Sequence, residues 1–171
     1  LEPPKEGVEE RTLFGRTYGV QLKDDLSGPA GDPVLCVRAQ ADWELLPKEQ
    51  SPNRLRVECN EGAFVLKRGG RYYMTYSAGN YRSPRYGIGY AVADTPLGPW
   101  EKPEDNPLLV ADLEKGISGT GHNSIVPSPD GTEWFILYHA HADPEHPSGD
   151  RVVQIDRLVF PEAGRMKVLG P

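Results

Sequence analysis

The chain has 171 residues, of which 37% are hydrophobic and 26% are charged, a composition typical of a globular domain with its own core. Its formal net charge of -6 at pH 7 argues against a nucleic-acid partner, because a phosphate backbone is bound by a basic surface. No apolar run reaches the roughly 18 residues of a membrane span, which argues against a membrane partner. The chain starts at Leu1 without a secretion signal, and this leaves its cellular location open.

Short apolar runs separated by turn residues predict an all-β chain. The 19 glycines and 17 prolines fall mainly between these runs, and aromatic and β-branched residues dominate inside them. Residues 1–11 are rich in Pro and Glu and predict an N-terminal arm before a domain at 12–171. No stretch keeps a helical period for long. In chain order, the predicted strands are centred on 18–22, 34–37, 63–67, 72–76, 86–92, 125–126, 134–138, 152–155 and 158–160.

The chain also repeats itself in two overlapping registers. The pattern at 61–76 returns at 122–138 with a spacing of 61 residues, and the pattern at 18–29 returns at 88–99 with a spacing of 70. A repeat of about 60–70 residues that holds three or four strands is typical of β-propeller blades with long loops. The chain then holds about two full blades and part of an earlier one. Such a piece leaves sheet edges uncovered, so we expect upstream sequence, a second chain or self-association to cover them.

Several motifs occur together in a fixed order. They are Asn60–Ser77, Gly87–Ala91 with Gly98–Trp100, Gly119–Ser124, Tyr138–Ala140 and Asp150–Leu158. In this order they resemble the C-terminal portion of glycoside hydrolase family 43, from about residue 16 to residue 170. The resemblance implies a partial five-bladed β-propeller, with about two and a half to three blades of antiparallel four-stranded sheets. It also implies an inverting hydrolase of α-L-arabinofuranosides or β-xylosides in plant cell-wall polysaccharide, with an arabinose- or xylose-containing oligosaccharide as substrate and no required cofactor.

By position in these motifs, the resemblance makes Glu61 the catalytic general acid. An inverting mechanism needs one carboxylic acid and one carboxylate base on opposite faces of the sugar. The two family aspartates lie upstream of residue 16, and Asp24, Asp25 and Asp32 match neither position. Ala63 also departs from the proline that usually follows the Glu-Gly pair. From the residues alone, a solvated glutamate at a strand end is the favoured interpretation of Glu61, and only the resemblance reverses this.

The resemblance assigns substrate binding to His122 and Arg151. In the family, the histidine lies near the propeller axis beneath the sugar, where it contacts a structural Ca²⁺ ion through water. One imidazole makes no calcium site by itself, because calcium prefers oxygen ligands. The alternative for His122 is a histidine bonded to the backbone of a tight loop. For Arg151, the alternative is a salt bridge to Asp150 or Glu145.

The remaining polar and aromatic candidates favour structural roles. His139 and His141 face one side of a strand, but a zinc site needs more than two ligands. We therefore expect both residues at a strand edge, with one end of the imidazole toward solvent. His146 is expected in a loop. Cys36 and Cys59 are expected as free thiols. The strand aromatics are expected mainly in the core between blades rather than on sugar, and these are Tyr72, Tyr73, Tyr76, Trp134 and Tyr138.

Three hypotheses follow. In the first, the chain is part of an enzyme whose missing aspartates come from upstream sequence or another chain. In the second, it binds carbohydrate without cleaving it. In the third, it self-associates to cover its open edges, as a homo-oligomer or with a complementary N-terminal half of a propeller.

Overall fold

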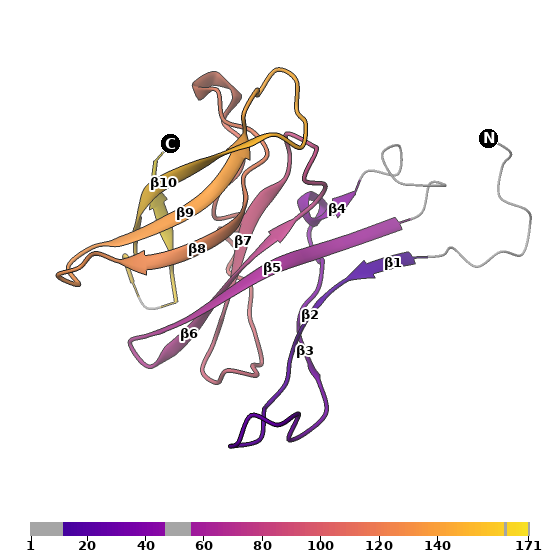
Figure 1. The fold of residues 1–171 in the computed structure, drawn as a ribbon, viewed down its shortest axis with the longest axis vertical. Helices are drawn as coiled ribbons and strands as arrows, with labels where there is room; N and C mark the ends of the chain where they lie inside the picture. The colour runs from indigo at the N-terminus through magenta and orange to yellow at the C-terminus, as the bar shows by residue number, and fades with distance from the viewer. Residues whose placement is uncertain (1–11, 47–55, 163, 171) are drawn as a thin grey trace, which may run out of the picture.

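The computed structural model describes residues 12–46, 56–162 and 164–170, and these residues form an all-β fold (Figure 1). Two short 3₁₀ turns, Asp42–Glu44 and Leu113–Lys115, are the helical elements among them, and no helix in this part of the chain is long and apolar enough to cross a membrane. The predicted arm at 1–11 lies outside the described residues. In chain order the strands are β1 (Thr12–Gly15), β2 (Thr17–Gly19), β3 (Val34–Val37), β4 (Leu45–Leu46), β5 (Arg56–Arg68), β6 (Arg71–Ala78), β7 (Gly87–Ala93), β8 (Gly121–Pro127), β9 (Trp134–His141), β10 (Arg151–Val159) and β11 (Lys167–Leu169).

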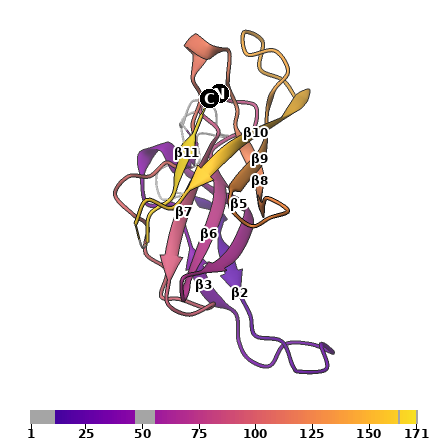
Figure 2. The ribbon, with the colours of Figure 1, turned by 90° about the vertical axis from the view of Figure 1, so that its left-hand side faces the viewer.

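The strands form three sheets, and the β2-β3 pair lies in the chain between β1 and β4 of the central sheet. The central sheet has the order β1-β5-β6-β7, with β4 also pairing β5, and the last sheet has the order β11-β10-β9-β8. Strands β2 and β3 form a separate antiparallel pair. All pairings between named strands are antiparallel except β1 with β5, which is parallel. Figures 1 and 2 show the sheets side by side, as expected for successive blades.

Tight turns set the register of the two long hairpins. Gly69 and Gly70 join β5 to β6 with φ values of 57° and 83°, which other residues adopt only with strain. Gly131 joins β8 to β9 at φ 71°, and its N–H donates to the carbonyl of Ser128 at 2.9 Å. The glycines that mark the sequence repeat therefore both lie in hairpin connections, although the first connection spans residues 69–70 and the second spans residues 128–133.

The hydrophobic core lies in two clusters, one on each side of the central sheet. Every residue of β7 is buried, because this strand packs on both faces. The cluster toward the last sheet contains Tyr73, Ile88, Tyr90, Val92, Leu109, Ile125, Ile136, Tyr138, Leu158 and Met166. The cluster toward β2 and β3 contains Cys36, Val37, Met74, Tyr76, Ala78 and Ala91, with Trp43 and Trp100 packed against it. The expectation that strand tyrosines fill the core between blades is confirmed for Tyr73, Tyr76 and Tyr138.

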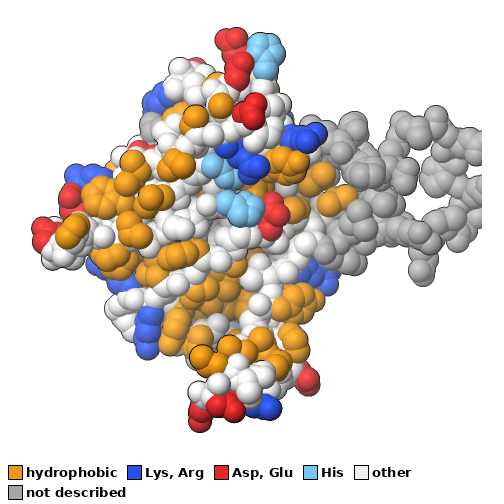
Figure 3. Space-filling view, viewed as in Figure 1, with side chains coloured by type: hydrophobic (Ala, Val, Ile, Leu, Met, Phe, Trp, Pro, Cys, Tyr) orange, Lys and Arg blue, Asp and Glu red, His pale blue; other side chains and the backbone are white. Residues whose placement is uncertain are grey.

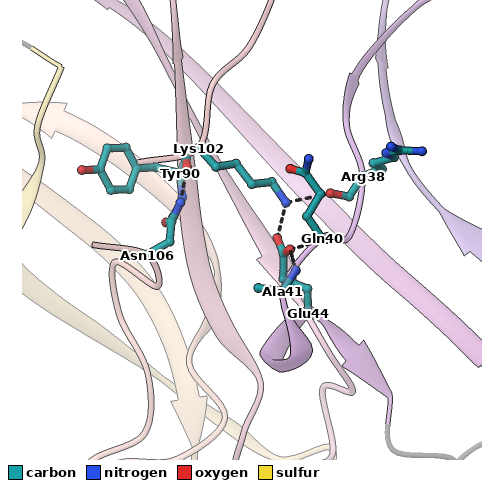
Figure 4. A network of polar contacts seen from close by, with 7 residues as sticks. All are labelled: Arg38, Gln40, Ala41, Glu44, Tyr90, Lys102 and Asn106. Carbon is teal, nitrogen blue, oxygen red and sulfur yellow. Dashed lines mark hydrogen bonds and ion pairs between the residues drawn. The ribbon is translucent and has the colours of Figure 1, made fainter. Parts of the chain in front are cut away.

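A buried ion pair between Glu44 and Lys102 lies beside the second cluster (Figure 4). Glu44 is 0% exposed, and its Oε2 accepts the backbone N–H groups of Gln40 and Ala41 at 2.7 and 2.9 Å. Lys102 Nζ bonds Glu44 Oε1 and donates to the carbonyl of Arg38 at 2.7 Å. Burial by itself raises the pKa of Glu44, but Lys102 and the two amides outweigh it and lower that pKa. Glu44 is therefore ionised in the folded protein.

A second polar contact in Figure 4 satisfies backbone groups at the edge of β7. The Asn106 side chain accepts the N–H of Tyr90 at 2.8 Å and donates to the carbonyl of Tyr90 at 2.7 Å. The loop after β7 thus supplies both hydrogen bonds that a neighbouring strand would have supplied.

The cysteines behave as expected, since Cys36 and Cys59 are both free thiols. Burial, and then the nearby charge of Glu61, raises the pKa of Cys59 to about 11.

One face of the last sheet is apolar and exposed. Val153 and Ile155 of β10 are 79% and 59% exposed, and they lie opposite His139 and Leu137 of β9. Val126 of β8 is exposed as well. Exposed apolar side chains on one face of a sheet are a common feature of surfaces that contact another protein.

Candidate functional site

Glu61 lies at a β-bulge in β5. It pairs with Ser77 of β6, and regular pairing resumes only at Phe64 with Thr75, so Gly62 and Ala63 together oppose one residue. Gly62 has φ 61°, a left-handed conformation that glycine adopts without strain. A bulge bends its strand and redirects the neighbouring side chains, which is why bulges recur beside active sites. The bulge therefore sets the direction of the half-buried Glu61 side chain.

A matching bulge in β8 carries His122. Gly121 pairs with His139, and pairing resumes at Ser124 with Leu137. His122 has φ 46°, which is uncommon for a residue other than glycine, and its N–H donates to Ser77 Oγ at 2.8 Å. The left-handed residues of the two bulges are Gly62 and His122. Although the sequence repeat aligns Glu61 with His122, the structural counterpart of His122 is therefore Gly62.

Tyr86 connects the two bulges. Its hydroxyl donates to Glu61 Oε1 at 2.7 Å and lies 2.9 Å from His122 Nδ1. The residue is 0% exposed and immediately precedes β7. Burial, and then the carboxyl of Glu61, raises the pKa of the Tyr86 phenol, so the phenol keeps its proton. Tyr86 is not recognisable as a site residue from the sequence, because an aromatic residue at the start of an apolar strand has the pattern of a core residue.

Gly121 provides the space that the Tyr86 ring occupies, and this is testable. A Cβ atom at position 121 would lie 2.0 Å from Tyr86 Cε1, far inside van der Waals contact. We expect Gly121→Ala to lower the free energy of unfolding by about 1–3 kcal/mol or more, because the fully buried ring has to move. Urea unfolding measures this, with Gly28→Ala as control, since a Cβ there meets nothing within 4 Å. Equal stability of the two variants would contradict the packing described here.

His139 stacks beside Tyr86 and His122. Its ring centroid lies 5.9 Å from each of theirs, with interplanar angles of 17° and 24°. Its Nε2 atom is buried without a protein hydrogen-bond partner. Burial, followed by the charges of Arg151 and His122, lowers the pKa of His139 to about 4. His139 is therefore neutral at neutral pH.

His141 is held inside the protein. Only 2% of it is exposed, its Nε2 lies 2.8 Å from the carbonyl of Tyr81, and its Nδ1 lies 2.9 Å from Ser118 Oγ. A carbonyl only accepts, so Nε2 carries the proton and Ser118 donates to Nδ1. The expectation that His141 faces solvent at a strand edge is thus wrong. His146 is exposed in a loop, as expected, and pairs with Asp143.

Arg151 lies at the start of β10, where its charge helps to lower the pKa of His139. Its Nε donates to the carbonyl of Gly149 at 3.1 Å, and its guanidinium lies 5.4 Å from the centre of the Tyr81 ring. The alternative of a salt bridge to Asp150 or Glu145 is not what the structure shows. Figure 3 shows histidine side chains near the centre of this face, with an acidic side chain and basic side chains next to them.

The described residues do not fit a calcium ion on their own. No group of three or more His, Cys, Asp or Glu side chains in this part of the chain is arranged to hold a metal. Calcium takes six to eight oxygen ligands, whereas His122 offers nitrogen, and its Nδ1 already contacts the Tyr86 hydroxyl. An axial calcium ion would therefore need its oxygen ligands from elsewhere.

Asp24, Asp25 and Asp32 lie outside the bulge that carries Glu61. They belong to the connection between β2 and β3, which extends away from the sheets at the bottom of Figure 1. Asp25 closes a turn there by accepting the N–H of Ser27 at 3.0 Å. These aspartates are therefore turn residues.

Successive antiparallel sheets with neighbouring bulges are typical of part of a β-propeller. The family model for glycosyl hydrolases family 43 matches residues 6–166, and the chain belongs to this family. It is 39% identical over 106 residues to a β-D-galactofuranosidase of Aspergillus niger. This alignment covers 62% of this chain and 30% of that protein. It is 34% identical over 143 residues to an α-L-arabinofuranosidase of Humicola insolens, covering 81% of this chain and 26% of that protein.

Solved structures give the same assignment. A thermostable family-43 glycoside hydrolase superimposes with a TM-score of 0.82 and 50% identity, covering 92% of this chain and 48% of that one. The prediction of a partial β-propeller of this family is thereby confirmed. The chain spans about half of that structure and less than a third of the two curated relatives.

Proposed function

We propose that this chain supplies the general acid, Glu61, of an inverting glycoside hydrolase. The observation that carries the proposal is the hydrogen bond from Tyr86 to Glu61 at a bulge next to His122. It gives the carboxyl a fixed position in a family whose chemistry depends on paired carboxyl groups. His122 and Arg151 are proposed to bind the hydroxyl groups of the sugar, since His122 shares the Tyr86 hydroxyl with Glu61 and Arg151 acts on the neighbouring His139.

The catalytic base is proposed to come from blades outside this chain. The exposed apolar face around Val153 and Ile155 supports this, because it runs along the same side of the sheet as His139. We use "assembled propeller" for this chain together with the blades that complete its ring, whether they precede it in one polypeptide or belong to another. An axial calcium ion is part of the proposal only if those blades bring its oxygen ligands.

The proposed substrates are α-L-arabinofuranosides of plant cell-wall polysaccharide first, and β-xylosides second. The names of the two curated relatives support this order, because both describe enzymes that act on five-membered furanose rings. The test is hydrolysis by the assembled propeller of p-nitrophenyl α-L-arabinofuranoside, β-D-galactofuranoside and β-D-xyloside. We expect turnover of at least one, with proton NMR showing the inverted anomer as first product. Hydrolysis of none, or retention of configuration, would contradict the proposal.

A second candidate function is favoured by the exposed apolar face of β10. A chain that covers this face with a second copy of itself would bind carbohydrate without cleaving it, because the base is proposed to lie on blades outside this chain. Light scattering of the 171-residue chain over a range of concentrations tests the association. Isothermal titration with arabino- and xylo-oligosaccharides tests the binding. A clean monomer with a flat titration would contradict this candidate.

A further inference from the structure

Tyr86 contacts Glu61 and His122 through one hydroxyl group. The oxygen lies 2.7 Å from Glu61 Oε1 and 2.9 Å from His122 Nδ1. A hydroxyl has a single proton, so it can donate to only one of these atoms and has to accept from the other. The direction of the two hydrogen bonds decides what Tyr86 does to the carboxyl group.

Donation toward Glu61 is the arrangement that satisfies all three groups during turnover. The carboxylate left after proton delivery only accepts, so the Tyr86 proton points to Oε1. The Tyr86 oxygen then accepts from His122, which carries its proton on Nδ1. Ser77 fixes the His122 backbone at 2.8 Å, and this holds the imidazole in place beside the phenol.

We propose that Tyr86 is the positioning residue of Glu61: it occupies Oε1, so that the acid proton resides on Oε2 and faces the leaving group. This inference rests on the proposed function of Glu61 as general acid. Tyr86 itself touches neither the sugar nor the bond that breaks, and it acts through Glu61 alone.

The proton balance shows why this position raises the rate. The Oε2–H bond of Glu61 breaks as the proton moves to the glycosidic oxygen, and the bond from that oxygen to the anomeric carbon breaks with it. Water adds to the anomeric carbon and gives its proton to the base. Tyr86 keeps its own proton throughout. Its hydrogen bond strengthens as charge develops on Glu61, because a bond to a carboxylate is stronger than one to a neutral carboxyl group.

The surrounding side chains hold the Tyr86 phenol in one position. The absence of a side chain at Gly121 makes room for the ring, and His139 stacks on it at 5.9 Å. Burial keeps Tyr86 protonated and therefore able to donate. A group fixed in this way costs no reorganisation when the reaction takes place.

Leaving-group dependence separates positioning of the acid from a structural role. An alkyl leaving group needs the proton, whereas 2,4-dinitrophenolate leaves without it. For Tyr86→Phe in the assembled propeller we expect kcat/KM to fall about 10- to 100-fold on a methyl glycoside and less than about 3-fold on the dinitrophenyl glycoside of the same sugar. Tyr138→Phe is the matched control, since this buried phenol donates to Asp156 at 2.6 Å in the core, and we expect it to leave the ratio between the substrates unchanged.

Nitrogen-15 NMR of the four histidines reads the hydrogen-bond direction without activity. We expect neutral His122 to carry its proton on Nδ1 and to change to Nε2 in Tyr86→Phe. His141 is the internal reference, since its Nε2–H is fixed by the carbonyl of Tyr81.

Each outcome has a distinct meaning. An equal loss on both substrates, or no loss, would overturn the positioning role of Tyr86, as would a wild-type His122 protonated on Nε2. Full activity of Glu61→Gln on the methyl glycoside would instead refute the proposed function itself. If Glu61→Gln is inactive on that substrate while Tyr86→Phe matches wild type, only the inference about Tyr86 fails.

Discussion

Glu61→Gln is expected to lower kcat of the assembled propeller by about 10²- to 10⁴-fold on alkyl glycosides, the usual contribution of a general acid. Glutamine keeps the size and the acceptor oxygen of the side chain, so Tyr86 retains its hydrogen bond, but the amide has no acidic proton to deliver. KM is expected to change little, because the sugar hydroxyl groups are proposed to bind His122 and Arg151 rather than Glu61. Initial rates on a methyl glycoside and on its dinitrophenyl counterpart measure the effect, which shrinks on the second substrate.

Glu133→Gln is the matched control for this substitution. Glu133 lies in the turn between β8 and β9, pairs with Arg157 at the surface, and takes no part in the candidate site. Its loss is expected to leave kcat within about twofold of wild type and the stability within about 0.5 kcal/mol. If Glu61→Gln behaved like Glu133→Gln on both substrates, Glu61 would not be the acid.

Lys102→Met is expected to lower the free energy of unfolding at pH 7 by about 3–5 kcal/mol, because it leaves the fully buried Glu44 carboxylate without its cation. Methionine fills most of the volume of the lysine stem, so lost charge rather than lost packing dominates. Lys115→Met is the control, since Lys115 pairs with Asp112 at the surface, where removing the pair costs less than about 1 kcal/mol. Urea unfolding compares the two variants, and equal losses would contradict the role of the buried pair.

The pH dependence of the same pair has a definite sign. The folded state lowers the pKa of Glu44 below its ordinary value of 4.5. The stability that this carboxylate contributes is therefore present above the unfolded pKa and is lost as the pH falls through the folded pKa. In Lys102→Met the carboxyl group protonates at higher pH, so its deficit relative to wild type is expected to shrink between pH 7 and pH 4. A deficit that stays constant or grows over this interval would contradict this account.

Much of the fold could be predicted from the sequence, because its signals are local. The short aromatic and β-branched runs became β6, β7, β9 and β10, and the Gly69-Gly70 and Gly131 turns joined the hairpins where the repeat placed them. Strand β5 is longer than the predicted 63–67, since its first half pairs with β1 and β4. Those pairings join segments far apart in the chain, which no local pattern of residues reveals.

Ordered motifs in the sequence by themselves determined the family, the partial propeller, and Glu61, His122 and Arg151 as the candidate residues. Only the tertiary structure decided how these residues are connected. Tyr86 is 25 residues from Glu61 and 36 from His122, and it meets both because two bulges turn toward the start of β7. The ion pair of Glu44 and Lys102 spans 58 residues in the same way. A side chain's local pattern predicts whether it is buried, but its hydrogen-bond partner depends on which strands the fold brings together.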